Sequence, residues 1–141
     1  MNNLSTMIVE LLHELDKDFD PTLSSIINIS NYAEKIKNNA KIMSYFDKGN
    51  LVAFIAFYCN DLETRIGFMS MLAVSKNNQG KGLARSLIKS SIDLLKNENF
   101  NRYRLEVFKT NNKAINLYKK MGFEVISELD FSLILELELK K

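Results

Sequence analysis

The first apolar positions of the chain repeat with the period of an α-helix. Their spacing of three or four residues places them on one face, and they are Leu4, Met7, Ile8, Leu11, Leu12 and Leu15. His13 falls on the polar face, which indicates a solvated side chain rather than a catalytic one. A turn region follows, and NYAEKIKN predicts a second short helix with Asn31 and Glu34 as a capping box at its start.

The pattern then changes to that of β-strands. KIMSYFD and LVAFIAFYCN are joined by KGN, and this arrangement predicts a hairpin. The second run is apolar at nearly every position, so both of its faces are expected to be covered. RIGFMSMLAV predicts a third strand of the same kind.

Helices and strands alternate in the rest of the chain. Residues 80–97 carry an apolar helical face, RYRLEVF alternates as a strand does, and NKAINLYKKM predicts a helix that ends at Gly122. FEVIS and FSLILELEL read as the closing strands, the last with outward Glu136 and Glu138. This order predicts an α/β fold of the α+β layer type, and we expect one domain over residues 1–141.

Composition narrows the class of protein. The chain has 141 residues, of which 46% are hydrophobic and 26% charged, the balance of a globular domain with one core. No stretch is long and apolar enough for a membrane span, and the N-terminus lacks the basic start of a signal peptide. Cys59 has no partner for a disulfide, so we expect a buried, inert thiol and a cytoplasmic location.

Charge is distributed unevenly along the chain. Residues 76–120 carry eleven Lys and Arg but three Asp and Glu, although the whole chain has a net charge of only +2. A basic region of this kind can attract an anionic ligand, a nucleic acid or nothing at all. No aromatic platform for single-stranded nucleic acid is interleaved with these residues, so no nucleic-acid partner is expected.

Two of the five glycines lie one residue apart in QGKGLA, between a strand and a helix. The N–H groups of a helix start lack intrahelical partners and carry a partial positive charge, which suits a phosphate. Gly80 and Gly82 would let the backbone approach such an anion, with Lys81 and Arg85 adding charge nearby. GKG alone is more often a helix entry that binds nothing, because short glycine patterns are common.

Two longer blocks, LAVSKNNQGKGLARSLI and LEVFKTNNKAINLYKKMGF, resemble the GNAT superfamily of acetyl-CoA-dependent N-acetyltransferases. Gln79, Gly82 and Ala84 match the phosphate-loop motif of that family. The second block matches at Asn111, Ala114, Ile115, Leu117, Tyr118, Gly122 and Phe123. P-loop and dinucleotide-binding patterns fit worse, since no Ser or Thr follows Lys81 and no complete GxGxxG is present.

The resemblance implies a GNAT-like sheet that is mixed but mostly antiparallel, flanked by helices, with acetyl-CoA as the acetyl donor and no metal ion. The segment Leu72, Ala73 and Val74 would run beside the pantetheine arm and pair with its amides. The pyrophosphate would lie on the loop that follows. The implied cofactor residues are Leu72, Ala73, Val74, Gln79, Gly80, Lys81, Gly82, Leu83, Ala84, Arg85, Asn111 and Tyr118.

The resemblance also implies catalytic roles. Tyr118 is the candidate acid that protonates the departing thiolate, with a buried core tyrosine as the structural alternative. Glu106 is the candidate base, but it also suits a solvated acid on the outward face of a strand. Tyr58, Asn60 and Glu63 are weaker candidates, and a water chain could serve instead. Asn111 is expected to contact the cofactor and to cap the helix that follows it.

The leading hypothesis is an N-acetyltransferase that acts on a primary amine. The acceptor stays open between an amino sugar, a polyamine, an amino acid, a small toxin and a protein N-terminus. The chain departs from the family by opening with a helix where a strand is common, in the region that helps to form the acceptor pocket. The alternative is a non-catalytic acyl-CoA-binding module. Either a monomer or a homodimer is compatible with the sequence.

Overall fold

The computed structural model describes residues 3–139 and contains the elements that the sequence predicts. The helices are α1 (Leu4–Leu15), α2 (Ile29–Asn39), α3 (Leu83–Asn97) and α4 (Asn112–Lys120). The strands are β1 (Lys41–Asp47), β2 (Asn50–Tyr58), β3 (Ile66–Val74), β4 (Arg102–Phe108), β5 (Glu124–Glu128) and β6 (Ser132–Glu138). Within residues 3–139, no helix has both the length and the apolar character that a membrane crossing needs.

Two helix starts differ from the sequence-based expectation. The predicted capping box at Asn31 is wrong: the side chain of Asn28 caps α2 and accepts a hydrogen bond from the Asn31 amide at 3.0 Å. The helix extends back because Ile29, like Ala33 and Ile36, is buried on its inner face. α3 begins at Leu83 rather than at residue 80, so Gly80 and Gly82 stay outside the helix.

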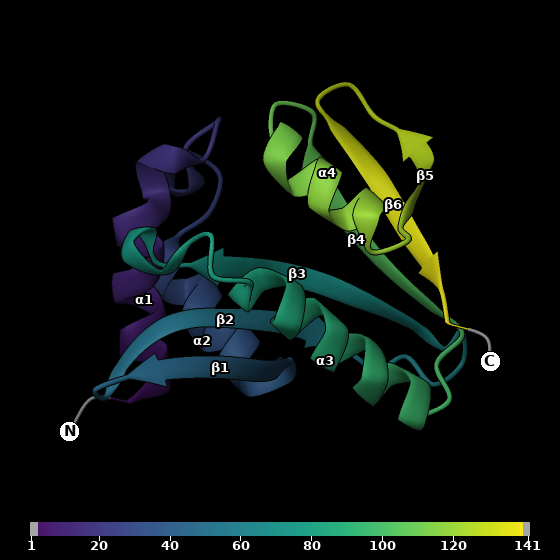
Figure 1. Ribbon diagram of the computed structural model, residues 1–141, viewed down its shortest axis with the longest axis horizontal. Coiled ribbons are helices and arrows are strands. Elements are labelled where there is room, and N and C mark those ends of the chain that lie inside the picture. Colours follow the sequence, from purple (N-terminus) through teal and green to yellow (C-terminus); the bar gives the residue numbers. More distant parts are fainter. Residues whose placement is uncertain (1–2, 140–141) are drawn as a thin grey trace.

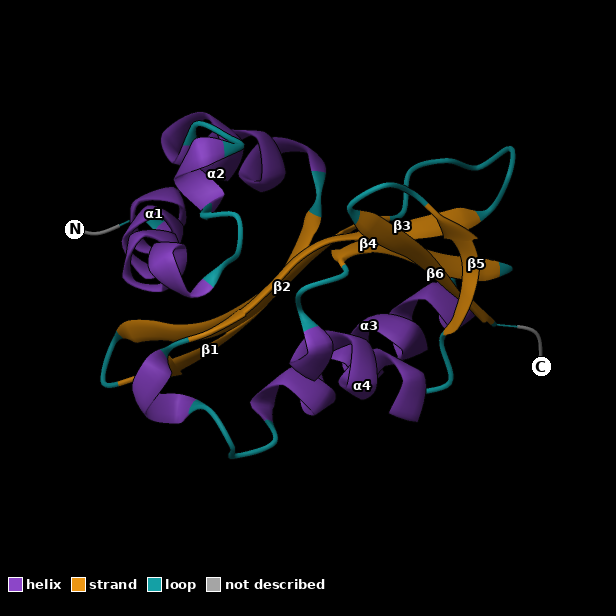
Figure 2. Ribbon diagram, turned by 90° about the horizontal axis from the view of Figure 1, so that it is seen from above, coloured by secondary structure: helices purple, strands orange, loops and turns teal. Residues whose placement is uncertain are grey.

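The six strands form one sheet in the order β1-β2-β3-β4-β6-β5. The β3–β4 pair is parallel, and the other four neighbouring pairs are antiparallel. α1 and α2 cover one face of the sheet and α3 and α4 cover the other, as Figure 2 shows from above. The structure therefore confirms the expected mixed, mostly antiparallel sheet flanked by helices.

β2 is apolar at nearly every position because helices cover both of its faces. Ala53, Ile55 and Phe57 belong to the core on the α3 side, which also includes Leu87 and Ile88. Three other residues of β2, Leu51, Phe54 and Ala56, belong to the core formed with α1 and α2. At β2 the sheet is thus the middle of three layers, and this strand is held in place from both sides.

The sheet splits between β3 and β4. Their ladder runs from Ile66 opposite Arg102 to Met69 opposite Leu105 and then stops. At the same point β3 has a bulge, since Phe57 pairs with Met69 and Ala56 with Met71, which leaves Ser70 unpaired with β2. A bulge bends its strand, so β3 turns away from β4 here. Figure 1 shows the two strands close together at one end and apart at the other.

Candidate active site

The opening between β3 and β4 holds a cavity of about 860 Å³. Its walls come from the diverging halves of β3 and β4, from the segment between α1 and α2, and from the starts of α3 and α4. This volume lies in the range of small-molecule sites, about 300 to 1,000 Å³. A ligand in the opening would contact both halves of the split sheet.

The start of α3 forms one end of the cavity and is built to receive an anion. Gly80 and Gly82 have φ angles of +80° and +82°, where residues with a Cβ are strained. A Cβ at either position would point into open space, with nothing within 4 Å. Gly82 is the N-cap residue of α3, and no side chain caps the helix. The first amides of α3 therefore remain available to an anion, which they and the helix dipole would stabilise.

Hydrogen bonds from side chains hold the loop that precedes α3. Gln79 donates from Nε2 to the Val74 carbonyl at 3.0 Å, and Asn78 donates from Nδ2 to Ser75 Oγ at 2.7 Å. Lys81 donates to Asn78 Oδ1 at 3.3 Å and, unlike Gln79, does not line the cavity. Gln79, which matches the family motif, therefore fixes the loop to the end of β3.

Leu72, Ala73 and Val74 line the cavity along β3. Because the ladder with β4 ends at Met69, the β4-facing edge of this segment has no strand partner within residues 3–139. A free strand edge can pair with the amides of an extended ligand. The sequence could not show that the free edge begins just after the bulge at Ser70.

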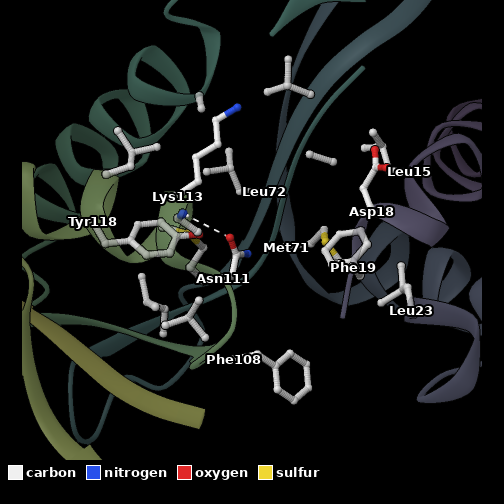
Figure 3. Close-up of a pocket in the computed structure, with 18 of the residues that line it drawn as sticks. Leu15, Asp18, Phe19, Leu23, Met71, Leu72, Phe108, Asn111, Lys113 and Tyr118 are labelled. Atoms are coloured by element: carbon white, nitrogen blue, oxygen red, sulfur yellow. Dashed lines mark hydrogen bonds between the residues drawn. The ribbon is translucent and has the colours of Figure 1, made fainter. Parts of the chain in front are cut away.

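Tyr118 lies on α4 at the side of the cavity, and Figure 3 shows its ring pointing inward. The side chain is 8% exposed and packs at 5.9 Å from the ring of Phe123. Burial raises the pKa of Tyr118 to about 12, so the phenol is neutral at physiological pH. The hydroxyl can therefore donate a hydrogen bond to a group in the cavity.

Asn111 caps α4, as its position before the helix predicts. Its Oδ1 accepts from the Ala114 amide at 3.2 Å, drawn as a dashed line in Figure 3. The residue also lines the cavity, together with Lys113 in the first turn of the helix. Lys113 was not among the predicted site residues, since the basic region offers many lysines and no pattern distinguishes this one.

Glu106 lines the cavity from β4, and its side chain is exposed to it. Oε2 of its carboxylate accepts a hydrogen bond of 2.6 Å from Ser132 Oγ. Ser132 is buried on β6, next to β4 in the sheet. The serine holds the carboxylate in one orientation, and sequence reasoning missed it because the contact joins residues 26 positions apart.

The three weaker candidates for the base lie elsewhere. Tyr58 is the last residue of β2, and Asn60 and Glu63 lie in the loop after it, whereas the cavity is bounded by the opposite end of β3. Tyr58 pairs with Phe68, in the part of the sheet where β3 and β4 are still joined. These three residues are therefore not part of the cavity lining, because the sheet opens only beyond Met69.

Of two further single residues, His13 has the expected environment and Cys59 does not. His13 is exposed on the polar face of α1. Cys59 is only partly buried, whereas the sequence predicted a buried thiol, and partial burial is the main cause that raises its pKa. A raised pKa keeps the thiol protonated, as an inert residue requires.

Two long-range hydrogen bonds connect the α1–α2 region to β3 and to the loop after β4, on either side of the cavity. The hydroxyls of Tyr32 on α2 and Ser70 at the bulge are 2.6 Å apart, and burial raises the pKa of Tyr32 to about 12. Thr110 donates from Oγ1 to the Asp20 carbonyl at 2.7 Å, which joins the loop after β4 to the loop after α1. No local pattern could have identified either contact, because the partners are 38 and 90 positions apart.

A split sheet, a free strand edge and an uncapped helix start together form a site whose shape and charge suit an elongated anionic ligand between diverging strands. The Acetyltransferase (GNAT) family matches residues 8–123, most of the chain. The chain therefore belongs to this family, as the two sequence blocks indicated.

Individual relatives agree with the family. N-alpha-acetyltransferase 30 of Saccharomyces cerevisiae is 39% identical over 57 residues, which cover 40% of this chain and 32% of that protein. A probable spermine N(1)-acetyltransferase of Bacillus subtilis subsp. natto is 31% identical over 98 residues, covering 65% and 64%. The chain thus spans less than two thirds of the length of these relatives.

Solved structures share the fold. The PaiA N-acetyltransferase of Thermoplasma acidophilum, solved in complex with coenzyme A, superposes with a TM-score of 0.77. The two sequences are 18% identical, and the match covers 95% of this chain and 92% of that one. At this identity the likeness concerns the fold alone.

Proposed function

We propose that this protein is an N-acetyltransferase that moves the acetyl group of acetyl-CoA to a primary amine by direct attack. The observation that carries the proposal is the split between β3 and β4, with an uncapped helix start at one end of the cavity and Tyr118 beside it. Family membership supports the reaction class, and the coenzyme A complex of the Thermoplasma relative supports the donor.

The donor substrate fits the residues that are present. Its pyrophosphate would accept hydrogen bonds from the first amides of α3, where Gly80 and Gly82 leave the approach open. Arg85 and Lys113 line the same cavity and would add positive charge. The amides of the pantetheine arm would pair with the free edge from Leu72 to Val74. A backbone N–H of that edge would also stabilise the oxyanion of the tetrahedral intermediate.

The acceptor must lose a proton before it can react, because an alkylammonium has no lone pair. Glu106 is the candidate that takes this proton, directly or through one water, and Ser132 keeps its carboxylate oriented. The neutral amine nitrogen then adds to the thioester carbonyl and forms the tetrahedral intermediate. This intermediate collapses as the carbon–sulfur bond breaks, and the nitrogen loses its extra proton to the base or to water, which leaves a neutral amide. Holding both reactants in one cavity can lower the barrier by about 7 to 11 kcal/mol.

Tyr118 would assist the departing sulfur. A phenol with a pKa of about 12 is a weaker acid than a thiol of pKa about 8.5, so it stabilises the thiolate chiefly as a hydrogen-bond donor. The thiolate then takes a proton from solvent, or from Tyr118 with reprotonation of the phenol by solvent, and leaves as free coenzyme A. The burial of Tyr118 suits this role because it keeps the hydroxyl protonated over the physiological pH range.

The names of the two relatives suggest two acceptor classes for this chain, a polyamine and the α-amine of a polypeptide. The alternative function is a non-catalytic module that binds acyl-CoA. Calorimetric titration with acetyl-CoA, followed by thiol release with a panel of primary amines, separates the two. Binding with amine-dependent thiol release is the expected result, whereas binding without release from any amine would favour the module.

A further inference from the structure

The wall of the cavity that comes from the α1–α2 segment is apolar except for Asp18. Six of its residues share this character and line the cavity: Leu15, Phe19, Pro21, Leu23, Ile26 and Ile27. Figure 3 shows Phe19 and Leu23 on the side opposite Tyr118 and Lys113, with Met71 of β3 beside Phe19. The donor would occupy the side of α3 and α4, so this wall is left for the acceptor.

Negative charge is scarce in the cavity. Among residues 3–139, the acidic side chains that line it are Asp18 and Glu106. Asp18 is solvent-exposed and lies 3.9 Å from the ammonium of Lys76, so part of its charge is already compensated. Within residues 3–139, Glu106 forms no ion pair, so it can face one ammonium group.

The other polar groups on this side add no charge. The hydroxyls of Tyr32 and Ser70 bind each other at 2.6 Å, and Tyr32 stays neutral because burial raises its pKa to about 12. A polyamine would place further ammonium groups against apolar side chains. Burying a charge without a partner is strongly unfavourable, so such an acceptor would bind poorly.

We infer that the acceptor is a primary amine with a single positive charge, attached to an apolar group. The amine would meet Glu106, and the apolar group would pack against Phe19 and Met71. This inference rests on the proposed acetyltransferase function and selects among its possible acceptors. A small amine and the N-terminus of a polypeptide with an apolar first residue both have this chemistry.

The test compares kcat/KM for four acceptors with acetyl-CoA: leucinamide, glycinamide, lysinamide and spermidine. Leucinamide and glycinamide carry the same charge and differ by an apolar side chain, so their ratio reports the apolar wall. We expect leucinamide to exceed glycinamide by about ten- to a hundredfold, the usual discrimination by an apolar pocket. A preference for spermidine or lysinamide, or equal rates for leucinamide and glycinamide, would overturn the inference.

Two variants test whether the apolar wall causes the preference for leucinamide over glycinamide. Phe19→Ala is expected to lower the ratio of leucinamide to glycinamide about tenfold. Phe46→Ala is the matched control, because Phe46 is 53% exposed and does not line the cavity, and it should leave the ratio unchanged. Equal ratios in the Phe19 and Phe46 variants would contradict the assignment of the wall.

Ile26→Glu tests the role of charge. Ile26 is 47% exposed at the cavity, so the fold should tolerate the added carboxylate. We expect spermidine to gain at least tenfold relative to leucinamide in this variant. Binding of the same amines to the coenzyme A complex, measured by calorimetry, should change in parallel, and an unchanged ranking would count against the inference.

A tetrapeptide that begins with leucine distinguishes the two sources of the acceptor. A kcat/KM well above that of leucinamide assigns the acceptor to polypeptide N-termini, and a lower value assigns it to small amines. Failure of every amine to react while acetyl-CoA binds would refute both the proposed function and this inference. Transfer without a preference for apolar amines would refute the inference alone.

Discussion

At the scale of single residues, Tyr118 combines a core position with a place in the cavity. Its ring packs against Phe123, and the residue is 8% exposed yet lines the opening between β3 and β4. The same burial that stabilises the ring keeps the hydroxyl protonated, since the pKa rises to about 12. The structural and functional interpretations of this tyrosine are therefore compatible.

Tyr118→Phe separates the two roles because it keeps the ring and removes the hydroxyl. We expect turnover to fall between about tenfold and ten-thousandfold, while the affinity for acetyl-CoA changes little. The loss should be smaller for a thioester with a more acidic leaving thiol, which needs less assistance. Steady-state kinetics with two such thioesters provide the measurement.

Tyr58→Phe is the matched control for this substitution. Tyr58 lies outside the cavity, on the part of β2 where the sheet is still joined, so its variant should retain the turnover of the parent. Full activity of Tyr118→Phe would show that Tyr118 contributes only packing and that its hydroxyl has no part in the reaction.

At the scale of elements, the loop between β3 and α3 decides where an anion can bind. Gly82 has a φ of +82° and serves as N-cap without any side-chain cap, so the first turn of α3 presents free amides. The loop is attached to β3 through the bond from Gln79 to the Val74 carbonyl. This bond fixes the position of the anion site relative to the free edge of β3.

Gly82→Glu should abolish acetyl-CoA binding, because the added carboxylate would repel the pyrophosphate and fill the open space in front of the helix. Gly49→Glu is a close control: Gly49 also has a φ of +82° and nothing within 4 Å of an added Cβ, but it lies in the β1–β2 turn. Both substitutions introduce similar backbone strain, about 1 kcal/mol or more. Calorimetry should find binding lost only in the Gly82 variant, and equal affinities would remove the phosphate-loop assignment.

At the scale of the whole molecule, the two cores contain tyrosines that burial keeps neutral. Burial raises the pKa of both Tyr118 and Tyr32 to about 12 and raises that of Tyr103 further. The unfolded chain would ionise these phenols near their ordinary pKa of about 10. Below pH 10 both states hold the protons, whereas above it the unfolded state releases them first. The free energy of unfolding should therefore fall as the pH rises from 10 to 12.

Tyr118→Phe should reduce this alkaline loss. Between pH 10 and 12, each such tyrosine lowers the free energy of unfolding by about 1.4 kcal/mol per pH unit. By pH 12 the free energy of unfolding of the variant should therefore have fallen by about 2 kcal/mol less than that of the parent. Urea unfolding at pH 8, 10 and 11.5 measures the difference, with pH 8 as the reference for the cost of the substitution itself. The same pH slope in the parent and the variant would contradict the burial of this hydroxyl.

The sequence by itself predicted the order and type of the elements, because hydrophobic periodicity is a local property of the chain. It also indicated the family, since both motif blocks are contiguous, and it identified Asn111 as the cap of α4. It failed at the start of α2, where the cap at Asn28 depends on how far the buried face of the helix extends.

Only the tertiary structure decided the shape of the site. The cavity depends on the bulge at Ser70 and on the end of the β3–β4 ladder at Met69. It also depends on hydrogen bonds between residues distant in the sequence, from Ser132 to Glu106 and from Thr110 to Asp20. The same geometry removed Tyr58, Asn60 and Glu63 from the cavity and left Lys81 outside its lining. Sequence patterns report which residues share a face of one element, whereas a cavity depends on where neighbouring strands separate, and that point is decided by pairing and packing between elements.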